Sequence, residues 1–277
     1  FRHRLIMFRV SVVEGSVLRF VMARRLLGKD LYRSACYLVD GLLVDSGIPH
    51  LSGKIAKALS RHHISAIVNT HAHEDHMGAN AILQESRRLP VFAHRAALPT
   101  LSDPGMLTLL PYQRLFFGKP LPSMGEPLGD VLQTERHRFR VIHSPGHSPD
   151  HVVLHDEEKG WIFSGDVFIG GQDRVFRGSY DIREMIRTLK TLASLGAEIM
   201  FTGMGNVIRK PTRQIERKIS YYEEMSHKVV KLVREGMEPS EVARRLFPGD
   251  RTVRFVTSGN FSAEHLVRSF LTASEGQ

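Results

Sequence analysis

The feature that most restricts how this chain can fold is a dense group of metal-binding side chains at residues 70–76, which read THAHEDH. Five of these seven side chains can bind a metal ion or a proton. The group directly follows a short apolar stretch at residues 66–69 that predicts a β-strand, and loops after strands often project side chains into a cleft. Because neutral imidazoles and carboxylates are common zinc ligands, the pattern predicts a metal-binding loop rather than a polar loop of hydrogen-bonding histidines.

Two later segments supply further groups of the same kind. At residues 144–151 the sequence SPGHSPDH follows a predicted strand, and its proline and glycine favour a tight turn that presents His147. At residues 163–166 the sequence FSGD places Asp166 at the end of another apolar strand. Taken with residues 70–76, these segments indicate that distant loops converge on one site.

The motifs His-x-His-x-Asp-His, Pro-Gly-His and Ser-Gly-Asp occur in this order and resemble those of the metallo-β-lactamase superfamily, over roughly residues 8–208. Within the superfamily the chain is most similar to the glyoxalase-II-like hydrolases. The resemblance implies an α/β protein with the αββα fold, a four-layer sandwich in which two sheets pack face to face and helices lie outside. It places the metal site at one edge of the sandwich.

The resemblance also implies the role of each motif residue. One metal ion would be held by His71, His73 and His147, and a second by Asp75, His76 and the bridging Asp166. Asp75 would also be the catalytic residue that orients the nucleophile or passes a proton to the leaving group. Asp45 and His151 would support the ligands through hydrogen bonds without binding metal. His94 is not expected to bind metal, and the residues that bind substrate are not predicted.

One position departs from the family pattern. The family usually has a last metal-binding histidine between small residues after the final strand, and here Met204 occupies that place. A thioether is a soft, neutral ligand that suits zinc or iron poorly in an oxygen-rich site. The second metal site is therefore expected to lack one protein ligand, and the pattern leaves open whether one ion or two bind.

The expected chemistry is hydrolysis by a metal-activated water, because a metal ion lowers the pKa of bound water from ~15.7 to about 7. Zinc is the expected metal, and iron or manganese could use the same ligands. The resemblance favours an ester, thioester, lactone or related bond in a small molecule. Two alternatives remain at this point: a metal-dependent phosphodiesterase or nuclease acting on RNA or DNA, and a metal-binding protein with weak or lost catalysis, which Met204 suggests.

The apolar pattern divides the chain into a catalytic domain at residues 7–208 and a helical C-terminal extension at residues 209–277, which is expected to cover or flank the active site. Strands predominate first, and amphipathic helices are predicted at 181–195, 213–234, 239–246 and 262–271. The proline-rich stretch at 99–127 predicts a lid beside the site, with one short helix near 107–116. We expect the extension to bind substrate or to pack, rather than to read DNA.

The net charge of +9 keeps a nucleic-acid partner open, although a solvated basic surface is the favoured interpretation. Five basic residues after Met204 either bind an acidic substrate or form the solvated face of a helix: Arg209, Lys210, Arg213, Arg217 and Lys218. The single cysteine, Cys36, excludes an internal disulfide and is expected to be buried. No apolar run reaches the ~18 residues of a membrane span, and residues 1–6 lack the apolar core of a signal peptide, so a cytoplasmic protein is expected. The oligomeric state is not predicted.

Overall fold

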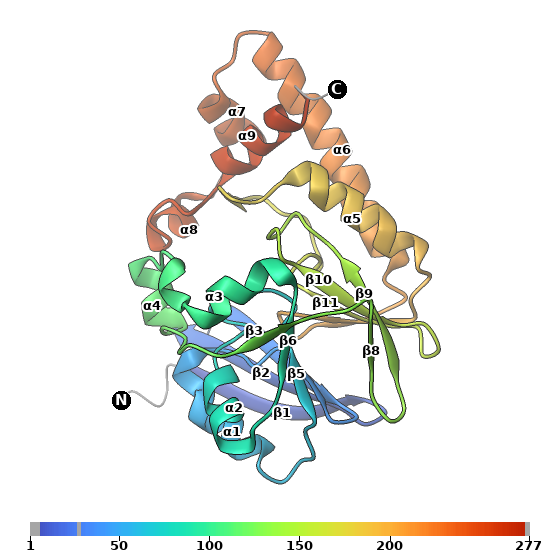
Figure 1. Ribbon diagram of the computed structural model, residues 1–277. Coiled ribbons are helices and arrows are strands. Elements are labelled where there is room, and N and C mark those ends of the chain that lie inside the picture. Colours follow the sequence, from blue (N-terminus) through green and yellow to red (C-terminus); the bar gives the residue numbers. More distant parts are fainter. Residues whose placement is uncertain (1–5, 27–28, 275–277) are drawn as a thin grey trace.

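Two β-sheets pack face to face in the structure, a computed structural model that describes residues 6–26 and 29–274 (Figure 1). The expectation about the start of the chain therefore falls almost entirely outside the described residues. Among the described residues, no helix is both long enough and apolar enough to cross a membrane. Cys36 lies fully buried, as the sequence predicted.

The first sheet has seven strands in the order β1-β2-β3-β4-β5-β6-β7. These strands are β1 (Ile6–Glu14), β2 (Val17–Leu26), β3 (Lys29–Val39), β4 (Leu42–Val44), β5 (Ala66–Val68), β6 (Val91–Ala93) and β7 (Gly125–Pro127). The first three form a long antiparallel meander, whereas β4 and β5 are parallel neighbours and every residue in them is buried. Because parallel strands point the same way, the loops after β4 and β5 leave the sheet at one edge.

The second sheet has six strands in the order β14-β13-β11-β10-β9-β8. These strands are β8 (Val131–Gln133), β9 (Arg138–His143), β10 (Val152–Asp156), β11 (Trp161–Gly165), β13 (Ile199–Thr202) and β14 (Val207–Arg209). The central strands β10 and β11 are buried along their whole length, as expected for strands covered on both faces. The motif loops at 144–151 and 166 follow β9 and β11 directly.

Three hydrophobic clusters join the four layers, one between the two sheets and one between each sheet and its helices. Aromatic side chains fill the space between the sheets, where Tyr37 meets Phe163 and Phe201. Helices α1 (Ser52–Leu59), α2 (Asn80–Arg87) and α3 (Leu98–Ser102) contribute to the cluster outside the first sheet. Helices α5 (Ile182–Ser194) and α6 (Thr212–Arg234) cover the second sheet. The fold is thus the αββα sandwich that the sequence predicted.

The C-terminal part is helical, as predicted, and consists of α6, α7 (Pro239–Leu246), α8 (Arg251–Val256) and α9 (Ala263–Ser274). Two features were not predicted: the short helix α8, and a two-stranded sheet that pairs β12 (Phe176–Arg177) with β15 (Phe261–Ser262). Residues of α6 and α9 share one hydrophobic cluster with residues of the second sheet. The boundary at residue 208 therefore stays a prediction.

The proline-rich stretch holds more structure than the single predicted helix. Besides α3 and β7 it contains α4 (Pro111–Phe116), which lies within the range predicted for the helix of the lid. Proline stands at the first or second position of both helices, where its missing N–H costs nothing.

Candidate metal centre

Three imidazole nitrogens from two loops, one after β5 and one after β9, meet at the edge of the sandwich. The Nδ1 atom of His73 lies 3.0 Å from Nε2 of His71 and 3.0 Å from Nε2 of His147. Burial, together with repulsion from neighbouring histidines, holds the pKa of all three well below its usual value. The three rings are therefore neutral at physiological pH, which is the form that binds a metal ion.

A second group adjoins the first and contains His71, His76 and Asp166. Nε2 of His76 lies 3.4 Å from a carboxylate oxygen of Asp75 and 3.5 Å from one of Asp166. Burial by itself lowers the pKa of His76, but these carboxylates and Asp45 outweigh burial and raise it well above its usual value. Nε2 of His76 and Oδ1 of Asp166 are buried without a hydrogen-bond partner. Such unpaired polar atoms are costly, and a divalent cation would satisfy both of them.

Asp45 orients two histidines of the loop at residues 70–76, called the metal loop below: His76 directly and His71 through Thr70. Its carboxylate accepts hydrogen bonds from the Thr70 amide at 2.8 Å, the Thr70 hydroxyl at 2.9 Å and Nδ1 of His76 at 2.8 Å. Because the Thr70 hydroxyl donates to Asp45, it accepts from Nδ1 of His71 at 3.0 Å. His71 thus carries its proton on Nδ1 and directs a bare Nε2 at the centre. The raised pKa of His76 keeps a proton on its Nε2 as well, and a metal ion bound there would displace that proton.

His151 and Asp150 tie the loop after β9 to the other two. Nε2 of His151 accepts a hydrogen bond from the Asp166 amide at 3.1 Å, and its Nδ1 pairs with the Ser144 hydroxyl at 2.9 Å. Burial lowers the pKa of His151 to about 4, which keeps the ring neutral and Nε2 an acceptor. Asp150 accepts from the Ala72 amide at 2.7 Å. His151 therefore contacts the backbone beside Asp166 instead of the centre itself.

Three side chains that the sequence analysis did not select complete the surroundings. The Tyr32 hydroxyl donates to Oδ2 of Asp75 at 3.0 Å, and Nη1 of Arg177 lies 3.3 Å from Nε2 of His73. Glu74 accepts a 2.6 Å hydrogen bond from Gln113 of α4. No motif could have revealed Tyr32 or Arg177, because each lies far from residues 70–76 in the sequence and its neighbours are typical of ordinary strands.

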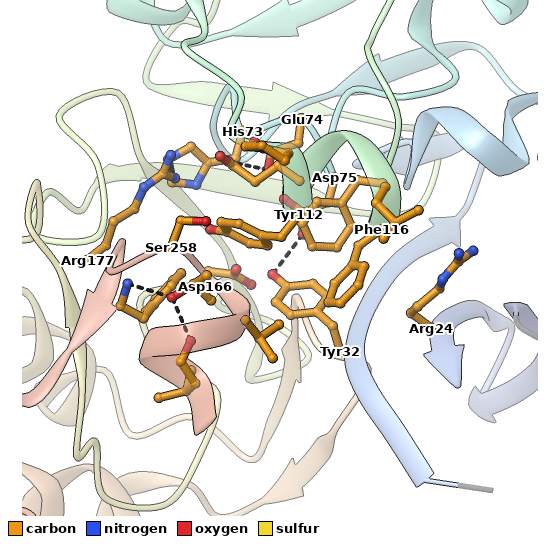
Figure 2. A pocket seen from close by; sticks show the side chains of 18 of the residues that line it. Arg24, Tyr32, His73, Glu74, Asp75, Tyr112, Phe116, Asp166, Arg177 and Ser258 are labelled. Carbon is orange, nitrogen blue, oxygen red and sulfur yellow. Dashed lines mark hydrogen bonds between the residues drawn. The ribbon is translucent and has the colours of Figure 1, made fainter. Parts of the chain in front are cut away.

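The centre opens into a cavity of about 980 Å³. Its walls come from β2, β3, the metal loop, α4, the segment around β12, and α8 with the residues after it. Figure 2 shows Tyr32, Tyr112 and Phe116 grouped on one side of Asp75 and Asp166, with Arg24 beyond them and Arg177 on the other side, reaching toward His73. Beside the groups of the centre, the cavity is thus mainly apolar and aromatic, and its lining includes Arg24 and Arg25 of β2 and Arg177 of β12.

Several residues discussed from sequence lie outside this cavity. None of the five basic residues after Met204 lines it; four are exposed, whereas Lys218 is buried and pairs with Asp173 at 2.8 Å. His94 stacks on His143, with ring centroids 4.6 Å apart, and belongs to neither histidine group. Met204 lies half-buried in the turn after β13. At the preceding residue, Gly203, any side chain would collide with Asp166.

Comparison with known proteins finds a matching family model, curated relatives and similar solved structures. The family model of the metallo-beta-lactamase superfamily matches residues 30–203. A beta-lactamase-like protein 2 homolog from Drosophila melanogaster is 27% identical over 194 residues, which cover 68% of this chain and 63% of that protein. A hydroxyacylglutathione hydrolase from Haemophilus influenzae is 29% identical over 135 residues, which cover 46% of this chain and 61% of that protein.

A further likeness is structural. A metallo-beta-lactamase family protein from Thermus thermophilus has a TM-score of 0.62 at 18% identity, covering 99% of this chain and 94% of that one. At this identity the likeness concerns the fold alone, and it includes the helical extension. The alignments span less than two thirds of the length of either curated relative.

Proposed function

The chain belongs to the metallo-beta-lactamase superfamily, and on that premise we propose that it hydrolyses an ester, thioester or lactone of a small molecule with a metal-activated water. One observation carries the proposal: neutral imidazoles from loops far apart in the sequence converge, beside unpaired buried atoms of His76 and Asp166, at the end of a large cavity. The hydroxyacylglutathione hydrolases among its distant relatives agree with hydrolytic chemistry.

We propose zinc as the resident metal, with iron or manganese suited to the same donors. Nε2 of His71, Nδ1 of His73 and Nε2 of His147 would hold one ion. Asp75, His76 and Asp166 would hold a second, with Asp166 placed to serve both. When bound, such ions make water acidic enough to supply a nucleophile at neutral pH and polarise the carbonyl under attack.

The protein's own groups would orient the reaction. Asp75 is buried beside Nε2 of His76 and can accept a proton from the attacking water or pass one to the leaving group. The Tyr32 hydroxyl fixes the direction of the Asp75 carboxylate by donating to Oδ2. Asp45 would orient the imidazoles through its hydrogen bonds, and His151 would hold the backbone amide of Asp166. Asp75 would thus transfer the proton and the other groups would position it, so that the reaction needs no nucleophilic serine or cysteine.

The walls of the cavity favour a small molecule over a nucleic acid. Nucleic-acid sites are basic surfaces that contact many phosphates. Here the walls are mainly aromatic and aliphatic, and the exposed basic residues at 209–217 lie outside the lining. We therefore keep phosphodiester cleavage as the alternative function, which the experiment below distinguishes from ester hydrolysis.

The test combines metal analysis with a substrate panel. Purified protein, metal-depleted protein and protein reloaded with zinc, iron or manganese are assayed on thioesters, lactones, β-lactams and bis-p-nitrophenyl phosphate. We expect metal-dependent turnover of an ester or thioester, loss of both metal and turnover in His73→Ala, and neither loss in the control His94→Ala. Full activity of His73→Ala would reject the assignment, turnover of the phosphodiester alone would replace it with a nuclease, and metal uptake without turnover would leave a binding protein.

The number of ions has a separate test at Met204. If the second site lacks one protein ligand, then Met204→His should raise the affinity for the second ion, measured by titration with a chromophoric chelator. An unchanged stoichiometry and affinity would show that the missing ligand lies elsewhere.

A further inference from the structure

Arg177 is a cation on a firmly packed segment of backbone, and it has no anionic partner among the described residues. It lies in β12, which pairs with β15, and the neighbouring Phe176 is buried in the core outside the second sheet. Asp173, four residues earlier, is held by buried Lys218 of α6 and by the Tyr222 hydroxyl. The backbone that carries Arg177 is thereby fixed at several points. Within the described part of the chain, however, no carboxylate forms a salt bridge with its guanidinium.

The guanidinium of Arg177 contacts Nε2 of His73. Metal binding would decide whether that nitrogen accepts or donates a hydrogen bond. Nδ1 of His73 points at the two other imidazoles, so a metal ion would occupy that nitrogen. The proton of the neutral ring then lies on Nε2, which becomes a donor. Arg177 has donors only, so two donors would face each other across the 3.3 Å that separates Nη1 from Nε2.

An acceptor is needed to satisfy both donors, and among the described residues no carboxylate lies within hydrogen-bond distance of the Arg177 guanidinium. Glu74 lines the same cavity, where its Oε1 accepts from Gln113 and its Oε2 is buried without a hydrogen-bond partner, but neither oxygen forms a salt bridge with Arg177. A guanidinium binds a carboxylate strongly through parallel hydrogen bonds. Asp75 and Asp166, on the cavity side of the centre, face the proposed metal ions instead.

We infer that Arg177 and Nε2 of His73 form an anion subsite that selects substrates with a carboxylate close to the scissile carbonyl and an apolar remainder. The apolar part would lie against Tyr32, Tyr112 and Phe116, on the opposite side of the centre in Figure 2. This inference rests on the proposed function and names its substrate class: amphipathic esters or thioesters of carboxylate-bearing small molecules. In the reaction the carbonyl–sulfur bond breaks, water supplies the new carbon–oxygen bond, and the thiol leaves with a proton.

The test uses matched thioesters that differ in one charge. Phenylacetyl thioesters of 3-mercaptopropionate and of 3-mercaptopropionamide place the carboxylate on the thiol side, and succinyl and succinamoyl thioesters of N-acetylcysteamine place it on the acyl side. For at least one pair we expect the zinc-loaded protein to favour the carboxylate roughly 10- to 100-fold in kcat/KM, as suits a charge-assisted hydrogen bond. Arg177→Gln should bring this ratio to about one, and Arg177→Lys should restore part of it.

Arg174→Gln is the matched control, because Arg174 is exposed, precedes Arg177 by three residues and does not line the cavity. It should keep the wild-type ratio. A binding measurement makes the inference independent of turnover: calorimetry compares the non-hydrolysable phenylethyl thioether of 3-mercaptopropionate with its amide. We expect tighter binding of the carboxylate by roughly 10-fold or more, lost in Arg177→Gln.

The two proposals fail in different ways. If both members of each pair are hydrolysed equally and Arg177→Gln leaves the ratios and the two Kd values unchanged, the anion subsite is wrong and the hydrolase stands. If no thioester is hydrolysed but the thioether still binds through Arg177, the thioesterase activity is wrong and the anion subsite stands.

Discussion

Asp45 shows how much of the centre depends on one side chain outside the proposed ligand set. Its backbone adopts a left-handed conformation, with φ of 58°, which aspartate and asparagine tolerate better than most residues. From this position both carboxylate oxygens act only as acceptors, toward Thr70 and His76. The direction of these hydrogen bonds decides which nitrogen of His71 and His76 is free for a metal ion.

Asp45→Asn should weaken metal binding while keeping the fold. The asparagine retains the shape and tolerates the backbone, but its amide group places a donor where two donors already point. His76 must then release the hydrogen bond or move its proton to Nε2. We expect metal affinity to fall about 10- to 100-fold and unfolding free energy to fall by about 1–3 kcal/mol. Chelator competition and urea unfolding measure the two effects.

Asp40→Asn serves as the control, because Asp40 is also left-handed, with φ of 46°, and binds Arg136 in a turn outside the centre. Its metal affinity should equal that of the wild type. Equal metal affinity in Asp45→Asn would show instead that Asp45 does not set the protonation of His76.

At this scale the sequence singled out the clustered motif residues together with Asp45 and His151, but not Tyr32 or Arg177. His71, His73 and His76 are recognisable because several ligand types stand within a few positions after a strand. Tyr32 and Arg177 have no such signal, since their roles arise only when β3 and β12 fold against the metal loop. A contact between residues more than forty positions apart leaves no trace in local patterns.

Helix α4 links the metal loop to the C-terminal extension and so closes the cavity. Gln113 donates to Glu74 at 2.6 Å, and the Tyr112 hydroxyl accepts from Asn260 at 2.7 Å. Phe116, at the other end of α4, lines the cavity together with Tyr112. Although α4 is only six residues long, hydrogen bonds join it both to the metal loop and to the C-terminal extension.

Phe116→Ala should reduce the selectivity for long acyl groups. Burying one methylene contributes about 0.8 kcal/mol, which corresponds to about fourfold in kcat/KM for each added carbon in the wild type. Removing the ring opens the wall, so this dependence on chain length should flatten. The measurement is kcat/KM for acetyl, butanoyl and hexanoyl thioesters of one thiol. Leu121→Ala, on a 67% exposed side chain outside the cavity, should keep the wild-type slope. An unchanged slope in Phe116→Ala would place the acyl group elsewhere.

The sequence predicts an element where its apolar residues recur periodically, and it misses an element that forms only through tertiary contacts. The helical spacing of apolar residues in α5 and α6 was sufficient to predict these two helices. The short α8, and β12 with β15, have too few residues for periodicity to show. They form because the loop after Asp166 pairs with the segment before α9, and both line the cavity or adjoin its residues.

The whole molecule has a hydrophobic cluster that crosses the division expected from sequence. Tyr222 of α6 and Phe270 of α9 are fully buried in the same cluster as Ile162 of β11 and Met200 of β13. Trp161, the only tryptophan, lies in the cluster between the sheets. Since Trp161 and Ile162 are adjacent in one strand, a disturbance of the extension should reach the interior of the sandwich.

Phe270→Ala tests whether the extension and the sandwich unfold together. Removing a fully buried ring should lower the unfolding free energy by about 3–5 kcal/mol. If the molecule is one cooperative unit, then urea unfolding followed by Trp161 fluorescence and by helical circular dichroism should give coincident midpoints, both shifted equally by the substitution. Phe255→Ala, on an 87% exposed side chain, should change neither midpoint. A shift confined to the circular dichroism signal would mean that the extension unfolds independently. In that case the cavity walls from α8 and Phe261 could be lost while the sandwich stays folded, and the extension could act as a separate lid.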